Sequence, residues 1–418
     1  MKIKTVKADY GKVIDIKNPK HRRPMRPLFI LMLVIRVLAF FELIKVGFTF
    51  TKKRMDEAGK GPYLILMNHS SFIDLKIASR IFFPKKYCIV CTSDGFVGKE
   101  WLMRLLGCIP TQKFVTDVSL IMDMIYAVKK KNTSILMYPE ASYSFDGCAT
   151  PLPRKLGTLI KKLGVPVVTV ITDGAFLYDP LYNGLRKRKV KVSAEVKCLL
   201  TVDEIKEKSV AEIDAMLDNE FSFDNFANQR DKKIAVTEDF RAEGLERILY
   251  KCPACKTENN MVGSGVSLTC KECGKEYFMD KFGQMNAVAG NTEFPHIPDW
   301  YRWERECVKE ELKNGTYKLD CDVQIGIMTD FKAIYMVGDG HLTHDENGFT
   351  LTGCDGQLTY RQSPLANYGL YADYYWYEIG DVICIGDKKR LYYCFPKTSQ
   401  NVAKARIAAE ELFIMKKG

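Results

Sequence analysis

The fold of this chain is decided by one stretch of the sequence, Tyr63-Leu-Ile-Leu-Met-Asn-His-Ser-Ser-Phe-Ile-Asp74. Its first five residues form a short apolar run, which is typical of a buried strand. A serine then follows in a position suited to cap a helix, and apolar residues recur at helical spacing as far as Phe82. The stretch therefore predicts a strand, a turn that contains His69, and a helix whose first turn contains Asp74.

The same alternation of strands and helices continues to residue 200. We expect strands over residues 63–67, 87–92, 134–138, 165–171 and 190–200, and helices over 72–82, 99–106, 117–131 and 154–163. This order predicts an α/β domain, in which a largely parallel sheet carries helices on both faces. Ligands bind such sheets beyond the carboxyl ends of the strands, and His69 and Glu140 each follow the end of an expected strand.

His69 and Asp74 are spaced as a base and its orienting carboxylate. A carboxylate in the first turn of a helix can accept a hydrogen bond from one nitrogen of an imidazole in the preceding turn, which leaves the other nitrogen free as a base. The chain has 5 histidines, so one such spacing is weak evidence by itself. A turn histidine that bonds to a helix-capping aspartate remains the alternative.

Three further blocks follow this pair in order along the chain. They are Gly107-Cys-Ile-Pro-Thr-Gln-Lys113, Tyr138-Pro-Glu-Ala-Ser-Tyr-Ser144, and Lys155-x-Gly157, which leads into Val165-Pro-Val-Val-Thr-Val170. Together with the first block, they resemble the four motifs of the PlsC-type glycerolipid acyltransferases over residues 27–220. The resemblance implies an α/β acyltransferase core that follows membrane-docking helices.

The resemblance assigns a role to each matching residue. His69 matches the base that removes the proton of an acceptor hydroxyl, and Asp74 matches the carboxylate that orients it. The acyl group then passes directly from an acyl thioester to the acceptor, without an acyl-enzyme. Glu140 matches a residue that helps to hold the acceptor, and Lys113 stands where the family has an arginine thought to bind phosphate.

The acceptor-binding motifs depart from the family pattern more than the catalytic pair does. Tyr143, Ala141 and Ser142 replace the arginine, the glycine and the threonine of the third motif. In the second motif, Lys113 lacks the planar fork with which an arginine holds phosphate. Acyl transfer is therefore a firmer expectation than the identity of the acceptor.

Two cations shortly after the third motif could compensate for these losses. Arg154 and Lys155 occupy this position, although a solvated helix face is the alternative interpretation of such a basic pair. We therefore expect substrate contacts from Lys113, Glu140, Ser142, Tyr143, Arg154 and Lys155.

The composition describes a globular body with one basic arm. The chain has 418 residues and a net charge of +11, and residues 1–62 contain 15 of its 62 basic residues but only 5 of its 51 acidic ones. The remaining chain is nearly neutral, so we expect no nucleic-acid partner. Most of the 14 cysteines stand alone in apolar runs and no secretory signal is visible, so we expect a reducing, cytosolic compartment.

The basic arm contains an apolar segment from Leu28 to Phe41, which is interrupted by Arg36. As a helix, these 14 residues would span about 21 Å, which is less than the ~30 Å hydrocarbon core of a bilayer. A cation in mid-membrane would also cost roughly 2.5–3.5 kcal/mol. We expect a helix or helical hairpin in the interface of the cytoplasmic face, peripheral or monotopic. A single span and a soluble core helix are the alternatives.

Four cysteines form a tight group in the second half of the chain. Cys252 and Cys255 make one CxxC pair, and Cys270 and Cys273 make another after fourteen intervening residues. This spacing suits a tetrahedral thiolate site for a structural Zn²⁺ in a zinc ribbon, with no position open for catalysis. A redox-active cysteine pair is the alternative.

The tail is rich in strand-like segments. A helix is expected over residues 300–313, strands over residues 316–396, and an amphipathic helix over residues 399–416. About seven strands and a closing helix resemble a pleckstrin-homology-like (PH-like) barrel, and a small β-sandwich is the alternative. Such a domain could bind a protein partner.

These expectations divide the chain into six segments. They are a basic arm with interfacial membrane helices (1–58), a PlsC-like acyltransferase domain (59–225), a connecting segment (226–250), a zinc ribbon (251–280), a linker (281–298), and a β-rich PH-like domain with a C-terminal helix (299–418).

The resemblance implies a lipid acyltransferase as the function. The acyl group would move from acyl-CoA or acyl-carrier protein to the hydroxyl of a lysophospholipid at a membrane lipid surface. We expect 1-acylglycerol-3-phosphate as the acceptor and phosphatidic acid as the product. The alternatives are a different lysolipid or hydroxyl lipid as the acceptor, or a catalytically inactive membrane adaptor that uses the ribbon and the C-terminal domain.

Overall fold

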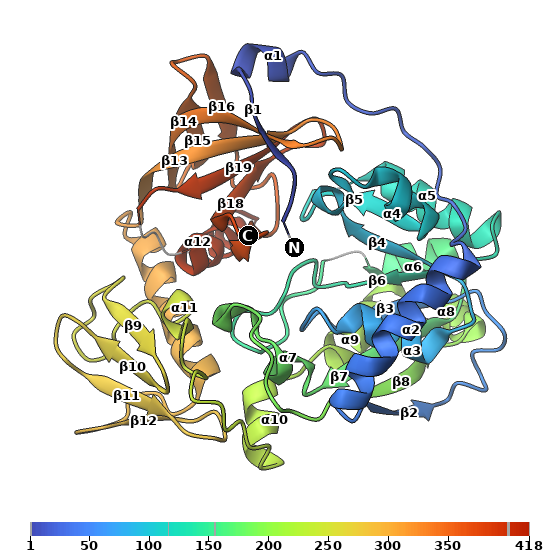
Figure 1. The fold of residues 1–418 in the computed structure, drawn as a ribbon, viewed down its shortest axis with the longest axis horizontal. Coiled ribbons are helices and arrows are strands. Elements are labelled where there is room, and N and C mark those ends of the chain that lie inside the picture. Colours follow the sequence, from blue (N-terminus) through green and yellow to red (C-terminus); the bar gives the residue numbers. More distant parts are fainter. Residues whose placement is uncertain (1, 116, 154–155, 399–401, 418) are drawn as a thin grey trace.

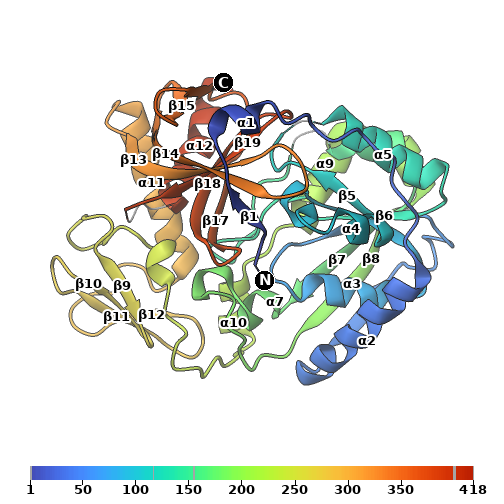
Figure 2. The ribbon, with the colours of Figure 1, turned by 45° about the horizontal axis from the view of Figure 1, so that its top comes forward.

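The computed structural model describes residues 2–115, 117–153, 156–398 and 402–417. Figures 1 and 2 show three parts: a seven-stranded sheet flanked by helices, a small four-stranded sheet, and an eight-stranded sheet that a C-terminal helix covers. No helix within the described ranges is long and apolar enough to cross a membrane. The expected α/β core and β-rich C-terminal part are both present.

The seven-stranded sheet is largely parallel, as expected. Its strand order is β2-β8-β7-β3-β6-β4-β5, and β7 and β8 form its one antiparallel pair among the described strands. The strands are β2 (Thr49–Lys53), β3 (Leu64–Met67), β4 (Tyr87–Thr92), β5 (Cys108–Thr111), β6 (Ser134–Met137), β7 (Val167–Asp173) and β8 (Ser193–Leu200).

Helices cover both faces of this sheet because the side chains of its buried strands alternate between two apolar clusters. Ile65 and Met67 of β3 face the cluster that contains residues of α2 (Phe29–Lys45) and α3 (Asp74–Phe82). Leu64 and Leu66 face the cluster that contains residues of α5 (Val118–Lys129), α6 (Leu156–Leu163), α8 (Val202–Glu207) and α9 (Val210–Glu220). A strand buried on both faces explains why the sequence of β3 is apolar without alternation.

The two edge strands, β2 and β5, are not predicted by the sequence pattern. Both are short, and β2 exposes Lys52 and Lys53. Charged and short strands are usual at the edge of a sheet, where they limit pairing with other chains. Pro110 is tolerated in β5 because an edge strand has a free side that needs no backbone N–H.

The N-terminal arm is divided between two parts of the molecule and does not form the single segment expected over residues 1–58. β1 (Thr5–Lys7) pairs in parallel with β14 (Ile334–Asp345) of the C-terminal sheet, and α1 (Tyr10–Ile14) packs on the same core. The chain then crosses to α5, where His21 and Arg23 bond to the carboxylate of Asp123 at 2.9 and 3.2 Å. Strand pairing with a distant sheet is invisible in a local pattern, so the sequence does not predict this division.

The apolar segment of the arm forms one helix, α2, rather than a hairpin. Only Ala39 and Leu43 are buried on its inner face, which packs beside α3. Near its C-terminal end, Glu42 pairs with Lys76 and Lys187 and accepts a hydrogen bond from Tyr178. The outer face exposes Phe29, Ile30, Leu33, Val34, Val37, Leu38, Phe40, Phe41 and Ile44.

The four-stranded sheet lies at the lower left of Figure 1 and is antiparallel in the order β12-β11-β10-β9. Its strands are β9 (Met261–Ser264), β10 (Ser267–Cys270), β11 (Glu276–Met279) and β12 (Met285–Ala287). The expected linker over residues 281–298 is therefore corrected, because it contains β12 and the start of α11 (Ile297–Lys313). Met285 is fully buried, which explains why this segment pairs with β11.

The C-terminal sheet is built so that its first strand pairs with its last. Its strand order is β16-β15-β14-β13-β19-β18-β17, with neighbours antiparallel, and β1 is added beside β14. The further strands are β13 (Leu319–Met328), β15 (Gly348–Gly353), β16 (Leu358–Gln362), β17 (Tyr371–Trp376), β18 (Gly380–Gly386) and β19 (Leu391–Pro396). The closing helix α12 (Val402–Lys417) contacts α11, β17 and β18.

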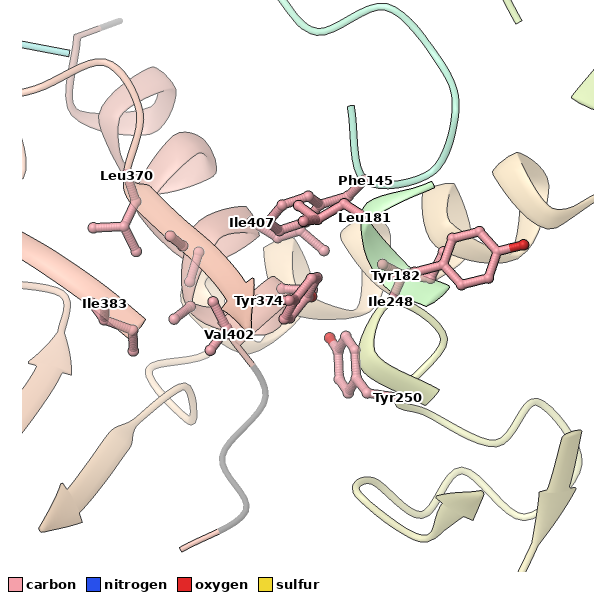
Figure 3. Close-up of a cluster of buried hydrophobic side chains, with 14 of the residues drawn as sticks. Phe145, Leu181, Tyr182, Ile248, Tyr250, Leu370, Tyr374, Ile383, Val402 and Ile407 are labelled. Carbon is pink, nitrogen blue, oxygen red and sulfur yellow. The ribbon is translucent and has the colours of Figure 1, made fainter. Parts of the chain in front are cut away.

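One apolar core contains residues from all three parts of the molecule. Figure 3 shows the section of this core between the α/β part and the C-terminal part. Phe145, Leu181 and Tyr182 enter it from the α/β part. Ile248 and Tyr250 enter from the segment before the ribbon, and residues of β17, β18 and α12 complete it. The C-terminal sheet is therefore packed against the α/β part through apolar side chains.

Candidate active site

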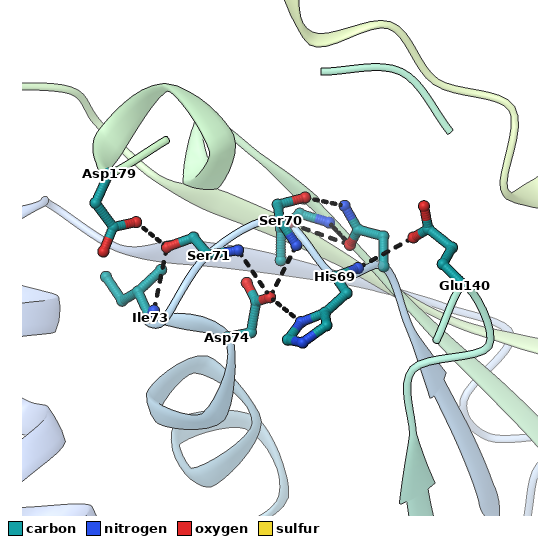
Figure 4. A network of polar contacts seen from close by, with 9 residues as sticks. His69, Ser70, Ser71, Ile73, Asp74, Glu140 and Asp179 are labelled. Carbon is teal, nitrogen blue, oxygen red and sulfur yellow. Dashed lines mark hydrogen bonds and ion pairs between the residues drawn. The ribbon is translucent and has the colours of Figure 1, made fainter. Parts of the chain in front are cut away.

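His69 and Asp74 meet in the turn between β3 and α3, as predicted. The Nδ1 atom of His69 lies 3.1 Å from Oδ2 of Asp74 (Figure 4). The same carboxylate oxygen accepts hydrogen bonds from the backbone N–H groups of Ser70 and Ser71, at 2.9 and 3.1 Å. An oxygen that accepts from two N–H groups has no proton to offer to Nδ1, so Nδ1 of His69 donates to it and Nε2 carries the free lone pair. Nε2 has no hydrogen bond to any described residue.

Burial sets the charge of this pair. The Asp74 side chain is 1% exposed and the His69 side chain 17% exposed. Burial lowers the pKa of His69 well below its usual range, and the charge of Lys113 lowers it further. Burial also raises the pKa of Asp74 to about 8, although the backbone N–H groups of Ser71 and Ser70 act in the opposite direction. The imidazole is therefore neutral at neutral pH, which is the form that can accept a proton.

Asn68 and Ser71 fasten the turn to the neighbouring strand β7 and its following segment. Oδ1 of Asn68 accepts hydrogen bonds from the backbone N–H and the hydroxyl of Thr172, at 2.8 and 3.1 Å. The hydroxyl of Ser71 donates to Asp179, which follows α7 (Ala175–Tyr178). Thr172 and Asp179 lie more than a hundred positions away in the sequence. No local signal could have identified these partners.

Two tyrosine rings enclose the imidazole of His69. The ring centroid of Tyr138 lies 4.0 Å from that of His69 with an interplanar angle of 23°, and that of Tyr143 lies 3.9 Å away at 29°. The half-exposed ring of Phe72 packs against Tyr143 in turn. The stacked rings cover the faces of the imidazole, so its ring edge with Nε2 remains for a substrate. Sequence reasoning considered Tyr143 only as a lost cation and missed this stacking.

Glu140 connects the His69 turn to the loop that follows the third motif. Its Oε1 accepts a hydrogen bond from the backbone N–H of His69 at 3.1 Å. Its Oε2 accepts from the backbone N–H and the hydroxyl of Thr150, both at 3.2 Å. Burial raises the pKa of Glu140 to about 7, against the effect of these donors. Its observed contacts are structural, and its role toward a substrate stays a prediction.

The other predicted substrate residues differ in how they reach the site. Lys113 follows β5, and its Nζ lies 4.1 Å from the ring centroid of Tyr371 in β17. The hydroxyl of Ser142 is buried and has no hydrogen-bond partner among the described residues. Arg154 and Lys155 lie outside the described residues. The contact of Lys113 with β17 is not expected from the sequence.

The four cysteines of the small sheet form a second candidate site. Their Sγ atoms all lie within 4.8 Å of one another, with Cys252 and Cys273 at 3.8 Å and Cys255 and Cys270 at 3.7 Å. A tetrahedral zinc ion with Zn–S bonds of about 2.3 Å places its sulfur atoms about 3.8 Å apart. A disulfide would need sulfur atoms about 2.05 Å apart. The cluster therefore fits a metal ion better than a redox-active cysteine pair.

A family model and two curated proteins resemble part of this chain. Residues 47–173 match the family model described as "Acyltransferase". The chain is 27% identical over 186 residues to the 1-acyl-sn-glycerol-3-phosphate acyltransferase of Saccharomyces cerevisiae, which covers 42% of this chain and 60% of the yeast protein. It is 28% identical over 120 residues to the chloroplastic 1-acyl-sn-glycerol-3-phosphate acyltransferase BAT2 of Brassica napus, which covers 27% of this chain and 33% of the plant protein.

A solved structure is also similar at low identity. The crystal structure of the 1-acyl-sn-glycerophosphate acyltransferase PlsC from Thermotoga maritima aligns with a TM-score of 0.36 at 18% identity, over 46% of this chain and 77% of that chain. The present chain thus spans 60% and 33% of the two curated relatives. His69, Asp74, Lys113 and Glu140 all lie within the segment that the family model matches. Residues 47–173 of this chain therefore resemble the acyltransferase family, as the family model and the two curated relatives indicate.

Proposed function

We propose that this protein is an O-acyltransferase that moves a fatty acyl group from acyl-CoA or acyl-carrier protein to the hydroxyl of a lysophospholipid. The observation that carries the proposal is the His69–Asp74 pair, in which Nδ1 is bonded to a buried carboxylate and Nε2 is left unoccupied. Both curated relatives are named for acylating 1-acyl-sn-glycerol-3-phosphate, which supports this lipid as the acceptor. The product would then be phosphatidic acid.

The chemistry requires one proton to move through His69. Nε2 takes the proton of the acceptor hydroxyl as that oxygen attacks the thioester carbonyl carbon. When the tetrahedral intermediate collapses, the carbon–sulfur bond breaks and the same proton passes to the leaving thiolate. Asp74 keeps Nδ1 protonated and stabilises the imidazolium that exists between the two steps. No covalent bond to the protein forms.

The acceptor's phosphate is assigned to Lys113. The charge of Lys113 lowers the pKa of His69, which supports a place for this lysine on the side of the catalytic pair. The buried hydroxyl of Ser142 is a further candidate contact, since it has no partner within the described part of the chain. Arg154 and Lys155 remain proposed contacts on the basis of their sequence position alone. Glu140 and Tyr143 would act through the placement of His69.

The membrane surface is reached through α2. Its outer face is strongly exposed, with Phe41 70% and Leu38 66% accessible, and an apolar patch of this size is typical of an interaction surface. An interfacial position suits a helix of this length, which would be peripheral or monotopic on the cytoplasmic face. Phe72 is also exposed and contacts Tyr143, so apolar surface extends toward the catalytic pair.

The other two parts have proposed roles of their own. Cys252, Cys255, Cys270 and Cys273 would hold a structural Zn²⁺. The order of the C-terminal strands, in which β13 pairs with β19 and α12 closes the sheet, supports a PH-like domain over the β-sandwich alternative. Such a domain could also bind a protein partner. The intact catalytic pair argues against an inactive adaptor.

The test is acyl transfer by the purified protein from radiolabelled acyl-CoA to 1-acylglycerol-3-phosphate in mixed micelles. His69→Ala should lower turnover by about 10²–10⁴-fold, as expected for loss of a positioned base. His341→Ala is the matched control, because His341 lies half-exposed in the C-terminal sheet and should leave the rate unchanged. Full activity of His69→Ala would refute the proposed function. Lysophosphatidylcholine and monoacylglycerol, assayed in parallel, would reveal a different acceptor.

A further inference from the structure

Strand β17 of the C-terminal sheet lies against the catalytic part beside the second motif. The hydroxyl of Tyr371 donates a hydrogen bond of 2.6 Å to Oδ2 of Asp94, which lies in η1 (Ser93–Phe96) directly after β4. Nε1 of Trp376 lies 3.3 Å from the same oxygen and 2.9 Å from the hydroxyl of Tyr371. All three side chains are buried. This network fixes β17 to the carboxyl end of a core strand.

The ring held by this network supports Lys113. Nζ of Lys113 lies 4.1 Å from the ring centroid of Tyr371, which is close enough for a cation–π contact. The hydroxyl of Tyr371 is anchored on Asp94, so the ring cannot swing away from the lysine without breaking a buried hydrogen bond. The position of Lys113 is therefore determined by a residue outside the acyltransferase-family segment.

A carboxylate of the same strand also acts on Lys113. Asp373 lies two residues after Tyr371, and alternate residues of a strand project to the same face. Burial raises the pKa of Asp373 to about 6, and the charge of Lys113 acts in the opposite direction. Asp373 is therefore mostly ionised at neutral pH, and its carboxylate also accepts a hydrogen bond from the backbone N–H of Tyr374 at 3.0 Å.

The third motif touches the C-terminal part as well. The ring of Phe145, two residues after Tyr143, lies 4.7 Å from that of Tyr374 in β17. Arg406 of α12 lies over Phe145 at 4.4 Å and approaches the backbone carbonyl of Tyr143 at 3.4 Å. The second motif thus contacts β17 through Lys113, and the segment of the third motif contacts both β17 and α12.

We propose that β17 forms one wall of the acceptor site, where Tyr371 positions Lys113 and Asp373 competes with the acceptor's anionic group for it. This proposal rests on the proposed function, because it deepens the role of Lys113. Tyr371 and Asp373 act through Lys113 and are positioning residues. The C-terminal sheet would then take part in choosing the acceptor.

The two residues should act in opposite directions. Tyr371→Leu removes the ring and should raise KM for 1-acylglycerol-3-phosphate by about 5–10-fold, with a much smaller change in kcat. Tyr371→Phe keeps the ring and should recover most of the affinity. Asp373→Asn removes the competing charge and should lower KM by about 3-fold at low salt. Tyr360→Leu, in the distant strand β16, is the control and should change neither constant. Loss of folding alone cannot raise KM in one variant and lower it in the other.

Two further measurements separate this proposal from the proposed function. The affinity of His69→Ala protein for 1-acylglycerol-3-phosphate, measured with and without the Tyr371→Leu substitution, tests the role of Tyr371 even if no acyl transfer occurs. Monoacylglycerol, which lacks the phosphate, should show no change in KM for any β17 variant. Equal effects of Tyr371→Leu on both acceptors would overturn the proposal. Weaker binding of 1-acylglycerol-3-phosphate by Asp373→Asn protein would also overturn it. So would a Tyr371→Leu variant with raised turnover of every acceptor, because β17 would then only block the site.

Discussion

The two halves of the candidate site are held in different ways. The catalytic half, His69 and Asp74, lies within one turn and is fastened by backbone N–H groups and by side chains of the same α/β part. The acceptor half, with Lys113 and Tyr143, is contacted by β17 and α12 of the C-terminal part. The residues of the proposed acid–base chemistry therefore lie close together in the sequence, whereas those proposed for acceptor recognition depend on packing between distant segments. Changes in each half should affect different kinetic constants.

The largest effect is expected from the catalytic half. Asp74→Asn replaces the carboxyl group that supports the imidazolium with a neutral amide and should lower kcat by about 10²-fold, within the usual range for a group that supports a base. KM for the acceptor should change little, because the hydrogen bonds of the Asp74 side chain to described residues all lie within the turn. Steady-state kinetics and thermal unfolding would check this. A raised KM with an unchanged kcat would contradict the division of the site into two halves.

Loss of the metal site should act on the acceptor half. The ribbon supports α11 and α12, because Nε1 of Trp300 donates to the carbonyl of Lys251 at 3.0 Å and Lys404 pairs with Glu258 at 2.7 Å. Cys252→Ser should remove bound zinc and lower the stability by several kcal/mol, as for other structural zinc sites. In protein that remains folded, KM for the acceptor should rise more than kcat falls. The zinc content, the free energy of unfolding and the steady-state kinetic constants of the variant would test these three expectations.

The matched control for the metal site is Cys307→Ser, since Cys307 lies in α11 outside the cluster. It should retain the metal and the affinity for the acceptor. If the cysteine cluster instead formed a redox-active pair, reducing agents would change the activity of the wild-type protein without any change in metal content.

A smaller effect is expected where the two halves meet, at Tyr143. Tyr143→Arg restores the cation of the family motif, and a charge-assisted contact is roughly twice as strong as a neutral one. We expect KM for 1-acylglycerol-3-phosphate to fall severalfold, while kcat also falls because the ring no longer stacks on His69. Tyr143→Phe keeps the stacking and should preserve kcat. A Tyr143→Arg variant with unchanged KM for every acceptor would show that the phosphate does not lie near this residue.

The sequence predicts the catalytic half well because its parts are close in the chain. The strand, the turn and the helix around His69 and Asp74 follow from an apolar run and a helical period, although the helix begins at Asp74 without the expected serine cap. The four-cysteine cluster is equally local, since paired CxxC spacings place the thiols together. The edge strands β2, β5 and β12 are too short and too polar to show a periodic pattern of apolar residues.

The acceptor half could not be predicted in the same way. Tyr371 and Asp94 are 277 positions apart, and the sequence carries no sign that a C-terminal strand meets the second motif. Part of the aromatic run that contains Tyr371 packs on the catalytic part, which the local sequence pattern does not indicate. The pairing of β1 with β14 is similar, because nothing in residues 5–7 specifies a partner near residue 335.

The smallest effect concerns the backbone of the acceptor half at Ala141. This residue has a φ of 60°, in the left-handed region that favours glycine, and the family has a glycine there. Ala141→Gly should therefore stabilise the protein by about 0.5–1 kcal/mol, less the small loss from its partly buried methyl group. Ala149, in the same loop, has no such φ, so Ala149→Gly should destabilise by a similar amount. Urea unfolding would measure whether each variant has a higher or lower free energy of unfolding than the parent protein. Destabilisation by both would show that the methyl group of Ala141 is needed for packing against the C-terminal sheet, which would tie the acceptor half to that sheet more closely.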